Sequence, residues 1–350
     1  MTEHKITMKD VAEAASVSTA TVGRVLHGRG YVSEDARDRV EEAILRTGFR
    51  LNMVAQSLRR SRSMTIGHLL TSIVPNPFFA GIELGVEQEA IRHGYNVLIW
   101  NVLSDPARER EGVEAFIRRQ MDAIIFTTPL DPANVELARQ AGVPVIQVER
   151  PYRENTHLVM VDNRVGATAA AEHLIELGHR NIAFIGKKFN DQTSLHEAVD
   201  LQRRDGWADT LMKHGIVPRP EWYAEADLYS SEQGFQAAQG FLSIQPAITA
   251  IMAACDILAA GALQAIYQRG LRVPEDISVV GFDDTYAPIL TPPLTSVRQP
   301  VYEIGCEAAR LAIELAEVQD RTTGPLHSRR LETSLVVRSS TGVPRRFFPG

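Results

Sequence analysis

The sequence has little cysteine: Cys255 and Cys306 are far apart in its 350 residues and lack the spacing of metal ligands. This usage argues against a disulfide framework and is typical of a reducing compartment. The opening residues, from Met1 to Ile6, contain no apolar segment of the kind that a secretory signal needs. No run approaches the roughly 20 apolar residues of a membrane helix. We therefore expect a soluble cytoplasmic protein with no membrane partner.

Common catalytic motifs are also missing. The chain has no Gly-x-Gly-x-x-Gly fingerprint, no phosphate-binding Gly-x4-Gly-Lys-Ser/Thr loop and no Gly-x-Ser-x-Gly elbow. Asp283 and Asp284 follow an apolar run and could hold a metal in a phosphatase, but no companion Lys/Thr series accompanies them. We expect no catalytic residue, no metal and no cofactor. An enzyme of the doubly wound class stays open as an alternative, and sugar-phosphate turnover that Asp283→Asn abolishes would favour it.

Charge is distributed unevenly along the chain. The formal net charge is −6, yet residues 1–63 contain 11 Lys and Arg against 8 Asp and Glu, while the remainder contains 26 against 35. A basic head on an acidic body suggests that only the head meets a polyanion. The length predicts two or three domains, and a composition of 44% hydrophobic and 23% charged residues is ordinary for globular cores.

The first fifty residues predict three short helices. Thr7 and Asp10 have the spacing of a capping box, and Ser18 is a natural N-cap for a second helix after a tight turn at Ser16. Two short helices joined in this way form a helix-turn-helix, whose second helix can enter the major groove of DNA. A third helix is expected from Ser33 to Gly48. The residues expected to be buried are Val11, Ala12, Ala15, Val22, Val25, Leu26, Val40, Ile44 and Leu45.

The second helix carries side chains suited to reading bases. Its outward positions are Thr19, Ala20, Gly23 and Arg24. Arginine is the commonest reader of guanine edges, and the methyl groups of threonine and alanine suit the methyl group of thymine. On these residues alone, an ordinary solvated Arg24 is an equal alternative.

A short basic segment follows the third helix. Asn52 can cap a helix of under two turns, which is marginal by itself, and the segment ends in arginines suited to phosphate contact. An exposed Leu58 beside a DNA-binding head suggests an apolar wedge into the minor groove. The alternative is an ordinary linker in which Leu58 packs against a neighbour.

These N-terminal motifs resemble the head of the lac-repressor/galactose-repressor family. The resemblance rests on residues 6–12, 17–22, 24–26 and 31–33, and on the series Asn52, Val54, Ala55, Leu58 and Arg59. It implies that Thr19, Ala20 and Arg24 read the major groove and that Ala55 and Leu58 enter the minor groove from paired hinge helices. The expected DNA-contacting set is Thr7, Ser18, Thr19, Ala20, Thr21, Arg24, Asn52, Ala55, Leu58 and Arg59.

Two positions of the head depart from the pattern of that family. Ser16 stands where the turn usually has glycine, at a cost of about 1 kcal/mol if the backbone there is left-handed. Gly23 stands where a serine usually precedes the recognition arginine, which removes a phosphate contact and weakens the helix. Both changes are expected to lower DNA affinity.

From Ile66 onward, apolar runs alternate with helix-length amphipathic segments. This pattern predicts parallel sheets covered by helices on both faces, and two such sets predict two doubly wound lobes. The expected strands are residues 66–70, 96–100, 123–126, 143–146, 182–185, 250–253 and 279–282. The fold class is therefore α/β, with an all-α head and a hinge helix in front.

The predicted domains are a head over residues 1–50, a hinge and linker over 51–63, and two interleaved sensor subdomains. The first subdomain takes residues 64–164 with 298–325, the second takes 165–297 with 326–342, and residues 343–350 form a tail.

Ligands of doubly wound folds bind at the carboxyl ends of strands. Phe78 and Phe79 follow the first run on a turn, Asp162 follows the fourth, and Asp283 the last, while Arg203 precedes Gly206-Trp207. Carboxylates and arginine can hold sugar hydroxyls, and an aromatic ring can stack on the apolar face of the sugar. Alternatively, the phenylalanines belong to the core and the aspartates to turns or helix caps.

The resemblance to the family extends along the chain to about Ser340, through residues 76–79, 105–109, 161–163, 173–179, 281–284 and 292–300. It implies a sensor of the periplasmic-binding-protein type, with Phe78, Phe79, Asp162, Arg203 and Asp283 around the effector. Cys255 stands where the family usually has asparagine, so a weak thiol replaces a group that donates and accepts, and hydroxyl recognition differs there.

Together these features predict a transcriptional repressor whose operator affinity responds to a small polar effector, such as a sugar or sugar derivative. A homodimer on a pseudopalindromic double-stranded operator is expected, because two-fold proteins match two-fold sites. The alternative from another class is a periplasmic solute-binding protein, which sugar binding without any DNA binding would support.

Overall fold

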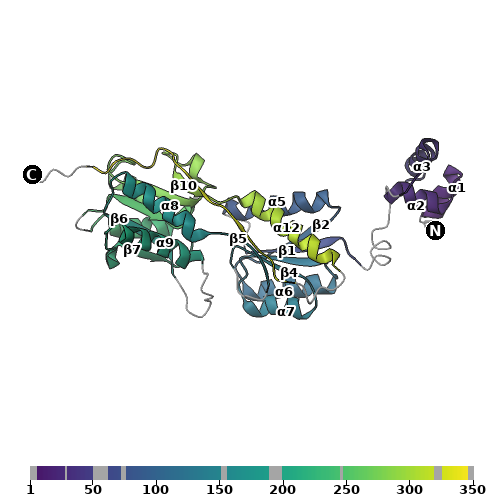
Figure 1. Cartoon of the computed structure of the whole chain (residues 1–350), viewed down its shortest axis with the longest axis horizontal. Coiled ribbons are helices and arrows are strands. Elements are labelled where there is room, and N and C mark those ends of the chain that lie inside the picture. The colour runs from purple at the N-terminus through teal and green to yellow at the C-terminus, as the bar shows by residue number, and fades with distance from the viewer. Residues whose placement is uncertain are drawn as a thin grey trace, which may run out of the picture. The chain divides into compact units, whose positions relative to one another are not determined.

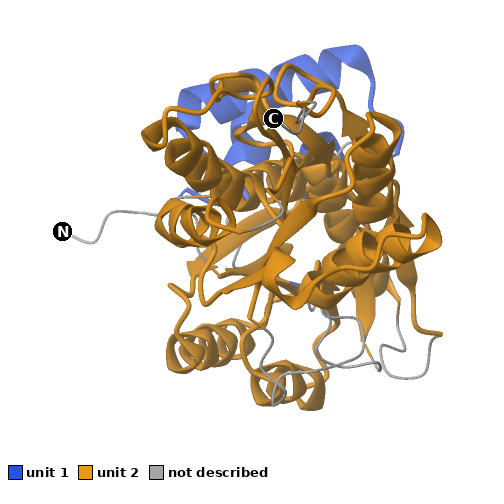
Figure 2. Ribbon diagram, turned by 90° about the vertical axis from the view of Figure 1, so that its left-hand side faces the viewer, with its two compact units in different colours: residues 1–62 blue, residues 63–350 orange. Residues whose placement is uncertain are grey.

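The computed structural model describes residues 6–27, 30–49, 62–71, 76–150, 156–188, 199–244, 247–318 and 325–345. The chain forms two compact units, residues 1–62 and residues 63–350 (Figure 2). The first is all-helical, and the second contains two parallel sheets covered by helices, which confirms the predicted fold class.

The described part of the first unit contains the helices α1 (Met8–Ala15), α2 (Thr19–His27) and α3 (Glu34–Thr47). Val11, Val22 and Val40, one from each helix, are fully buried in their common core. The predicted caps are present, because the Asp10 carboxylate accepts from the Thr7 amide at 2.7 Å, and the Ser18 hydroxyl accepts from the Thr21 amide at 3.1 Å. The sequence therefore predicted this unit closely.

Two details of the first unit concern the sequence predictions. Ser16 has φ 53, so the backbone of the turn is left-handed at the position where the family usually has glycine. The prediction that Leu45 is buried is wrong, since its side chain is 85% exposed. The buried face of α3 consists of Ala36, Val40 and Ala43, and Leu45 lies five residues beyond Val40, about 140° around the helix.

The first lobe of the second unit has a parallel sheet in the order β11-β5-β4-β3-β1-β2. Figure 1 shows α5 and α12 over one face and α6 and α7 over the other, and each face has its own apolar core. The strands are β1 (Thr65–Leu70), β2 (Asn96–Asn101), β3 (Ala123–Thr127), β4 (Val145–Val148), β5 (His157–Val161) and β11 (Ser328–Leu331). The helices are α5 (Pro77–Arg92), α6 (Pro106–Arg118), α7 (Pro132–Gln140) and α12 (Val301–Glu317).

Three helices of this lobe begin alike, with an Asn or Asp cap followed by proline in the first turn. At α5 the Asn76 side chain accepts from the Phe78 amide at 3.1 Å. Phe78 and Phe79 therefore lie in the first turn of a helix, and their predicted place on a turn is corrected. Proline fixes a helical φ without needing a hydrogen-bond acceptor, which is why the helix begins there.

The second lobe repeats the plan with the strand order β12-β10-β9-β8-β6-β7, in which β12 alone runs antiparallel to its neighbour. Its strands are β6 (Ile182–Lys187), β7 (Tyr223–Ala226), β8 (Ala250–Ala253), β9 (Ser278–Asp283), β10 (Thr295–Arg298) and β12 (Ser334–Val336). Its helices are α8 (Asn163–Glu176), α9 (Val199–Lys213), α10 (Ser231–Phe241) and α11 (Asp256–Gln268), with 3-10 turns η2 (Pro220–Trp222) and η3 (Ala287–Ile289).

The chain crosses between the lobes from β5 to α8, from β10 to α12 and from β11 to β12. The third crossing corrects a predicted boundary, because residues 326–331 were assigned to the second subdomain. β11 continues the sheet of the first lobe, with Leu331 paired to Val161. The lobe changes only after this strand.

The buried His179 connects the C-terminal segment to the second lobe through hydrogen bonds. The Nε2 of His179 donates to the Gly342 carbonyl at 2.9 Å, and its Nδ1 accepts from the Thr249 hydroxyl at 2.9 Å. Burial lowers the pKa of His179 to about 4, so the folded chain holds this ring neutral at pH values where an unfolded chain protonates it.

The lowered pKa of His179 predicts that this residue contributes less to the stability of the second lobe at acid pH. The stabilising contribution is complete above about pH 6.5 and decreases as the pH falls towards 4, because the unfolded state binds the proton first. Between pH 7.5 and pH 5, His179 is expected to lower the free energy of unfolding by roughly 2 kcal/mol. Urea titrations at both pH values would measure this, because the change in unfolding free energy between them should differ by about 2 kcal/mol between His179→Asn and the unchanged protein. The exposed His214 provides a control, since His214→Asn should respond to pH as the unchanged protein does.

Candidate functional site

The outward face of α2 is open to solvent. Thr19, Ala20 and Arg24 are all exposed, and Thr21 is partly buried. The Arg24 guanidinium has no ion pair or hydrogen bond with the described residues, although its stem lies over Gly30. A cation on the second helix of a helix-turn-helix, without a partner among the described residues, is available for an acceptor on DNA.

Other arginines of the head have structural partners. On α3, Arg39 donates to the Ala15 carbonyl at 3.4 Å and Arg46 to the Ala14 carbonyl at 3.0 Å. These carbonyls belong to the last turn of α1, where the helix leaves acceptors unsatisfied. Arg39 and Arg46 therefore fix α1 against α3, and only part of the positive charge of the head can serve DNA.

The predicted hinge contacts at Asn52, Ala55, Leu58 and Arg59 lie outside the described residues. Thr7 and Ser18 are present as helix caps, and the Ser18 hydroxyl also lies 2.9 Å from that of Thr21.

Gly23 lies in the middle of α2, where alanine is expected to give a more stable helix. A Cβ atom there would meet only the Met8 Cε at 3.5 Å, an ordinary contact. Gly23→Ala is expected to stabilise α2 by about 0.5–1 kcal/mol, because glycine loses more backbone entropy in a helix. Hydrogen exchange of α2 amides in the full chain should slow about three- to fivefold. Gly48→Ala is the matched control: Gly48 has φ 65, so a side chain there should speed exchange, and faster exchange in Gly23→Ala would contradict the prediction.

In the second unit, Arg203 is the centre of a buried polar group between the lobes. It extends from α9 and is 3% exposed, with Nε donating to Asn163 at 2.8 Å and Nη1 to the Ala254 carbonyl at 2.6 Å. Nη1 also lies 3.5 Å from the Asp283 carboxylate, and the guanidinium stacks on Phe282 at 3.8 Å. These contacts hold the guanidinium plane in one orientation.

Asp283 ends β9, and Gln299 follows β10. The Asp283 carboxylate accepts from the Gln299 amide at 2.8 Å, and burial raises its pKa to about 7. Asp283 has φ 101, and Glu149, at the end of β4 in the first lobe, has φ 71. Residues other than glycine rarely adopt a positive φ, and backbone strain of this kind is concentrated at functional sites.

Two acceptor oxygens of this region have no donor. Glu149 Oε1 and Gln299 Oε1 are buried and make no hydrogen bond within the described parts of the chain. Burial also raises the pKa of Glu149. A buried acceptor without a donor costs about 1–3 kcal/mol, and a hydrogen bond to either atom would relieve this cost.

An ion pair joins the two lobes beside Arg203. Arg150, which follows β4, lies 3.1 Å from Asp200 on α9, and the Tyr229 hydroxyl donates to the same carboxylate. We call the following residues the interlobe cluster: Glu149, Arg150, Asn163, Lys187, Asp200, Arg203, Tyr229, Cys255, Asp283 and Gln299.

The structure brings together three of the six predicted effector residues, Arg203, Cys255 and Asp283. Asp162 caps α8 by accepting from the Val165 amide at 3.0 Å. Phe78 is 5% exposed in the core of the first lobe, and Phe79 packs edge-on against it. Within the described residues, no hydrogen bond, ion pair or ring contact joins Arg203 to Asp162, Phe78 or Phe79.

Cys255 stands in the N-cap position of α11 and makes no capping bond from its side chain. Burial raises the pKa of its thiol well above the ordinary value, so it stays neutral and unreactive. Its neighbour Asp256 has a structural role, because its Oδ2 accepts from the amides of residues 285–287 at 2.8–3.2 Å and Oδ1 accepts from Ser296.

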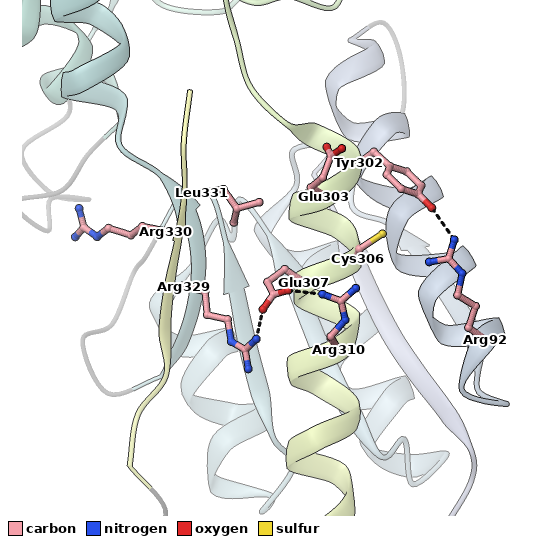
Figure 3. Close-up of a pocket in the computed structure, with 9 residues that line it drawn as sticks. All are labelled: Arg92, Tyr302, Glu303, Cys306, Glu307, Arg310, Arg329, Arg330 and Leu331. Atoms are coloured by element: carbon pink, nitrogen blue, oxygen red, sulfur yellow. Dashed lines mark hydrogen bonds and ion pairs between the residues drawn. The ribbon is translucent and has the colours of Figure 1, made fainter. Parts of the chain in front are cut away.

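A separate hollow of about 340 Å³ lies between α5, α12 and β11 (Figure 3). Its charges are paired within the lobe: Arg310 lies 2.7 Å from Glu307, Arg329 lies 2.7 Å from Glu314 and also pairs with Glu307, and Arg92 lies 2.8 Å from Glu89. These groups are partly exposed and compensate one another in pairs.

No helix within the described ranges combines the length and hydropathy needed to cross a bilayer. The same residues contain no group of three or more His, Cys, Asp or Glu arranged to hold a metal.

Comparison with known proteins agrees with this arrangement. Residues 7–52 match the family described as bacterial regulatory proteins, lacI family, and residues 171–341 match a periplasmic binding protein-like domain. The ribose operon repressor of Halalkalibacterium halodurans is 35% identical over 96% of this chain and 97% of its own length. The transcriptional repressor CytR of Escherichia coli K12 is 33% identical over 97% of each.

Solved structures show the same relationship. A lac repressor dimer bound to operator and the anti-inducer ONPF is 29% identical, with a TM-score of 0.80 over 97% of this chain and 100% of that one. The regulator CelR in complex with cellobiose is 29% identical, with a TM-score of 0.71 over 96% and 99%. These relatives are transcriptional regulators rather than enzymes. The chain belongs to the lacI family of bacterial regulatory proteins, with a LacI-type DNA-binding head and a periplasmic-binding-protein-like effector domain.

Proposed function

We propose that this repressor binds a pseudopalindromic operator as a homodimer and releases or grips it according to a small polar effector held by the interlobe cluster. The observation that carries the effector site is Arg203, buried and fixed beside Asp283, with unsatisfied acceptors on Glu149 and Gln299. Fixed donors beside open acceptors suit a polyhydroxylated ligand. The names of the relatives, a ribose operon repressor and a CelR–cellobiose complex, point to the same chemistry.

In the head, Arg24 reads base edges while Thr19 and Ala20 contact thymine methyl groups, and Thr7, Ser18 and Thr21 face the phosphates. This assignment is supported by the exposure of Thr19, Ala20 and Arg24. Because the target is DNA, we place the protein in the cytoplasm.

The Arg150–Asp200 pair suggests how the effector acts. It joins the lobes within the cluster, so a ligand there competes with it or reinforces it and changes how the lobes are held. A ligand shifts an equilibrium only by its difference in affinity for the two states, and this difference would appear as a changed affinity for DNA.

The test begins with a thermal-shift screen of the full-length protein against sugars, polyols, sugar acids and nucleobases. A ligand that binds the folded state raises its melting temperature by mass action. Fluorescence anisotropy then measures operator affinity with and without the hit, and the sign distinguishes induction from corepression. Sugar binding with no affinity for any duplex would instead support a solute-binding protein.

The proposed hinge is tested separately. If Leu58 inserts between base pairs, Leu58→Ala should weaken operator binding and reduce the preference over random DNA, because unstacked bases would lose their apolar partner. Anisotropy titrations on both duplexes measure this. Unchanged affinity and preference would show that Leu58 belongs to an ordinary linker.

A further inference from the structure

Lys187 is a cation of the interlobe cluster that has no counter-ion among the described residues. It is the last residue of β6, at the carboxyl edge of the second sheet, as Asp283 is the last residue of β9. Its side chain is half-buried, and its ammonium lies 5.6 Å from the centre of the Tyr229 ring. No carboxylate of the described residues pairs with it. The neighbouring Lys188, by contrast, is exposed.

The described groups around Lys187 do not supply a free negative charge to balance its ammonium. Burial and the nearby Arg150 both lower its pKa, and Asp200 acts in the opposite direction. The Asp200 carboxylate is already engaged, with one oxygen 3.1 Å from Arg150 and the other accepting from Tyr229. A half-buried ammonium that must share the one carboxylate near it in the described part of the chain is destabilising.

The other carboxylates do not restore the balance. Asp283 is already engaged with Arg203 and Gln299. Burial raises the pKa of Asp283 to about 7, so this group is partly protonated near neutral pH, and burial also raises the pKa of Glu149. Arg150, Lys187 and Arg203 then outnumber the ionised acids, and the cluster has a surplus of positive charge.

We propose that the effector carries an anionic group, a carboxylate or a phosphate, and that Lys187 binds it. This inference rests on the proposed function, in which the interlobe cluster is the effector site. The ammonium is a compact point charge with three donors, suited to either anion. The hydroxyl groups of the same molecule face Glu149, Asp283 and Gln299, so the ligand is an acidic sugar or a sugar phosphate rather than a neutral sugar.

The test compares acids with their neutral counterparts on the full-length protein. The pairs are D-gluconate with D-glucose, D-galacturonate with D-galactose, and D-ribose 5-phosphate with D-ribose, each measured by thermal shift and by calorimetric titration. We expect at least one acid to bind about tenfold or more tightly than its partner. Lys187→Met should remove that preference, because it weakens binding of the acid more than binding of the neutral sugar. Lys188→Met, the matched control, should bind as the unchanged protein does.

The pairs also separate the two anions, since preference for uronate or gluconate identifies a carboxylate and preference for ribose 5-phosphate a phosphate. Neutral sugars that bind as tightly as the acids, acid binding that Lys187→Met leaves intact, or binding of no acid at millimolar concentration would overturn the inference. DNA binding controlled by a neutral sugar would do so while leaving the proposed function in place. Lys187-dependent acid binding with no effect on DNA affinity would contradict the proposed function alone.

Discussion

Arg203→Leu is expected to weaken effector binding by about a hundredfold or more while leaving unliganded DNA binding nearly normal. The substitution removes the polar contacts of the guanidinium with Asn163, the Ala254 carbonyl and Asp283. Arg203 is buried, with 3% of its surface exposed. Breaking a buried charge pair by removing one partner typically costs 3–5 kcal/mol, part of which appears as lower stability of the second lobe. Calorimetric titration with a hit from the screen measures the loss of affinity.

Arg204 provides the matched control for this experiment. It is the next residue of α9, it is 38% exposed at its side chain, and it pairs at 2.8 Å with Asp205 on the surface. Arg204→Leu removes the same charge from the same helix and should bind the effector normally. Effector binding by Arg203→Leu at unchanged affinity would contradict its role in the site. Loss of DNA binding without effector would instead mark Arg203 as structural or the ligand as a corepressor.

Comparison of sequence and structure shows which signals determine the fold. The runs that predicted β1, β3, β6 and β9 are buried on both faces, so they read as continuous apolar segments. β5, β7, β10, β11 and β12 were not predicted. Of these, β7, β11 and β12 lie at sheet edges, where Tyr-Ala-Glu-Ala, Ser-Arg-Arg-Leu and Ser-Leu-Val remain partly exposed. Their pairing is decided by tertiary contacts that a local pattern does not contain.

The candidate site was predictable in part. Glu149 and Lys187 follow apolar runs that the sequence identified as strands, so the rule that ligands bind at carboxyl ends could have found both. Asp200 had no such signal, because it lies in the first turn of α9 and reaches Arg150 only when the two lobes meet. Phe78 was predicted to lie on a turn, with a place in the core as the alternative. It lies in the first turn of α5 and is 5% exposed.

Arg24→Ala is expected to weaken operator binding by about 1–3 kcal/mol, which is a loss of roughly 5- to 150-fold, and to relax base preference at one position of each half-site. Arg24 is exposed and pairs with no other described side chain. The substitution therefore breaks no hydrogen bond or ion pair within the described head, and the lost affinity reports the contact with DNA. Alanine is also a good helix former, so α2 should stay folded.

The measurement needs two duplexes, the sequence that the unchanged protein selects from a random pool and a scrambled version of it. Anisotropy titrations at one fixed salt concentration should show a large loss for Arg24→Ala on the selected duplex and a small loss on the scrambled one. Arg59→Ala should weaken both nearly alike, because a phosphate contact carries no sequence information, and should lower the slope of affinity against salt by about one. Equal losses on the two duplexes for Arg24→Ala would place that arginine on the phosphate backbone, and the bases would then be read by other residues.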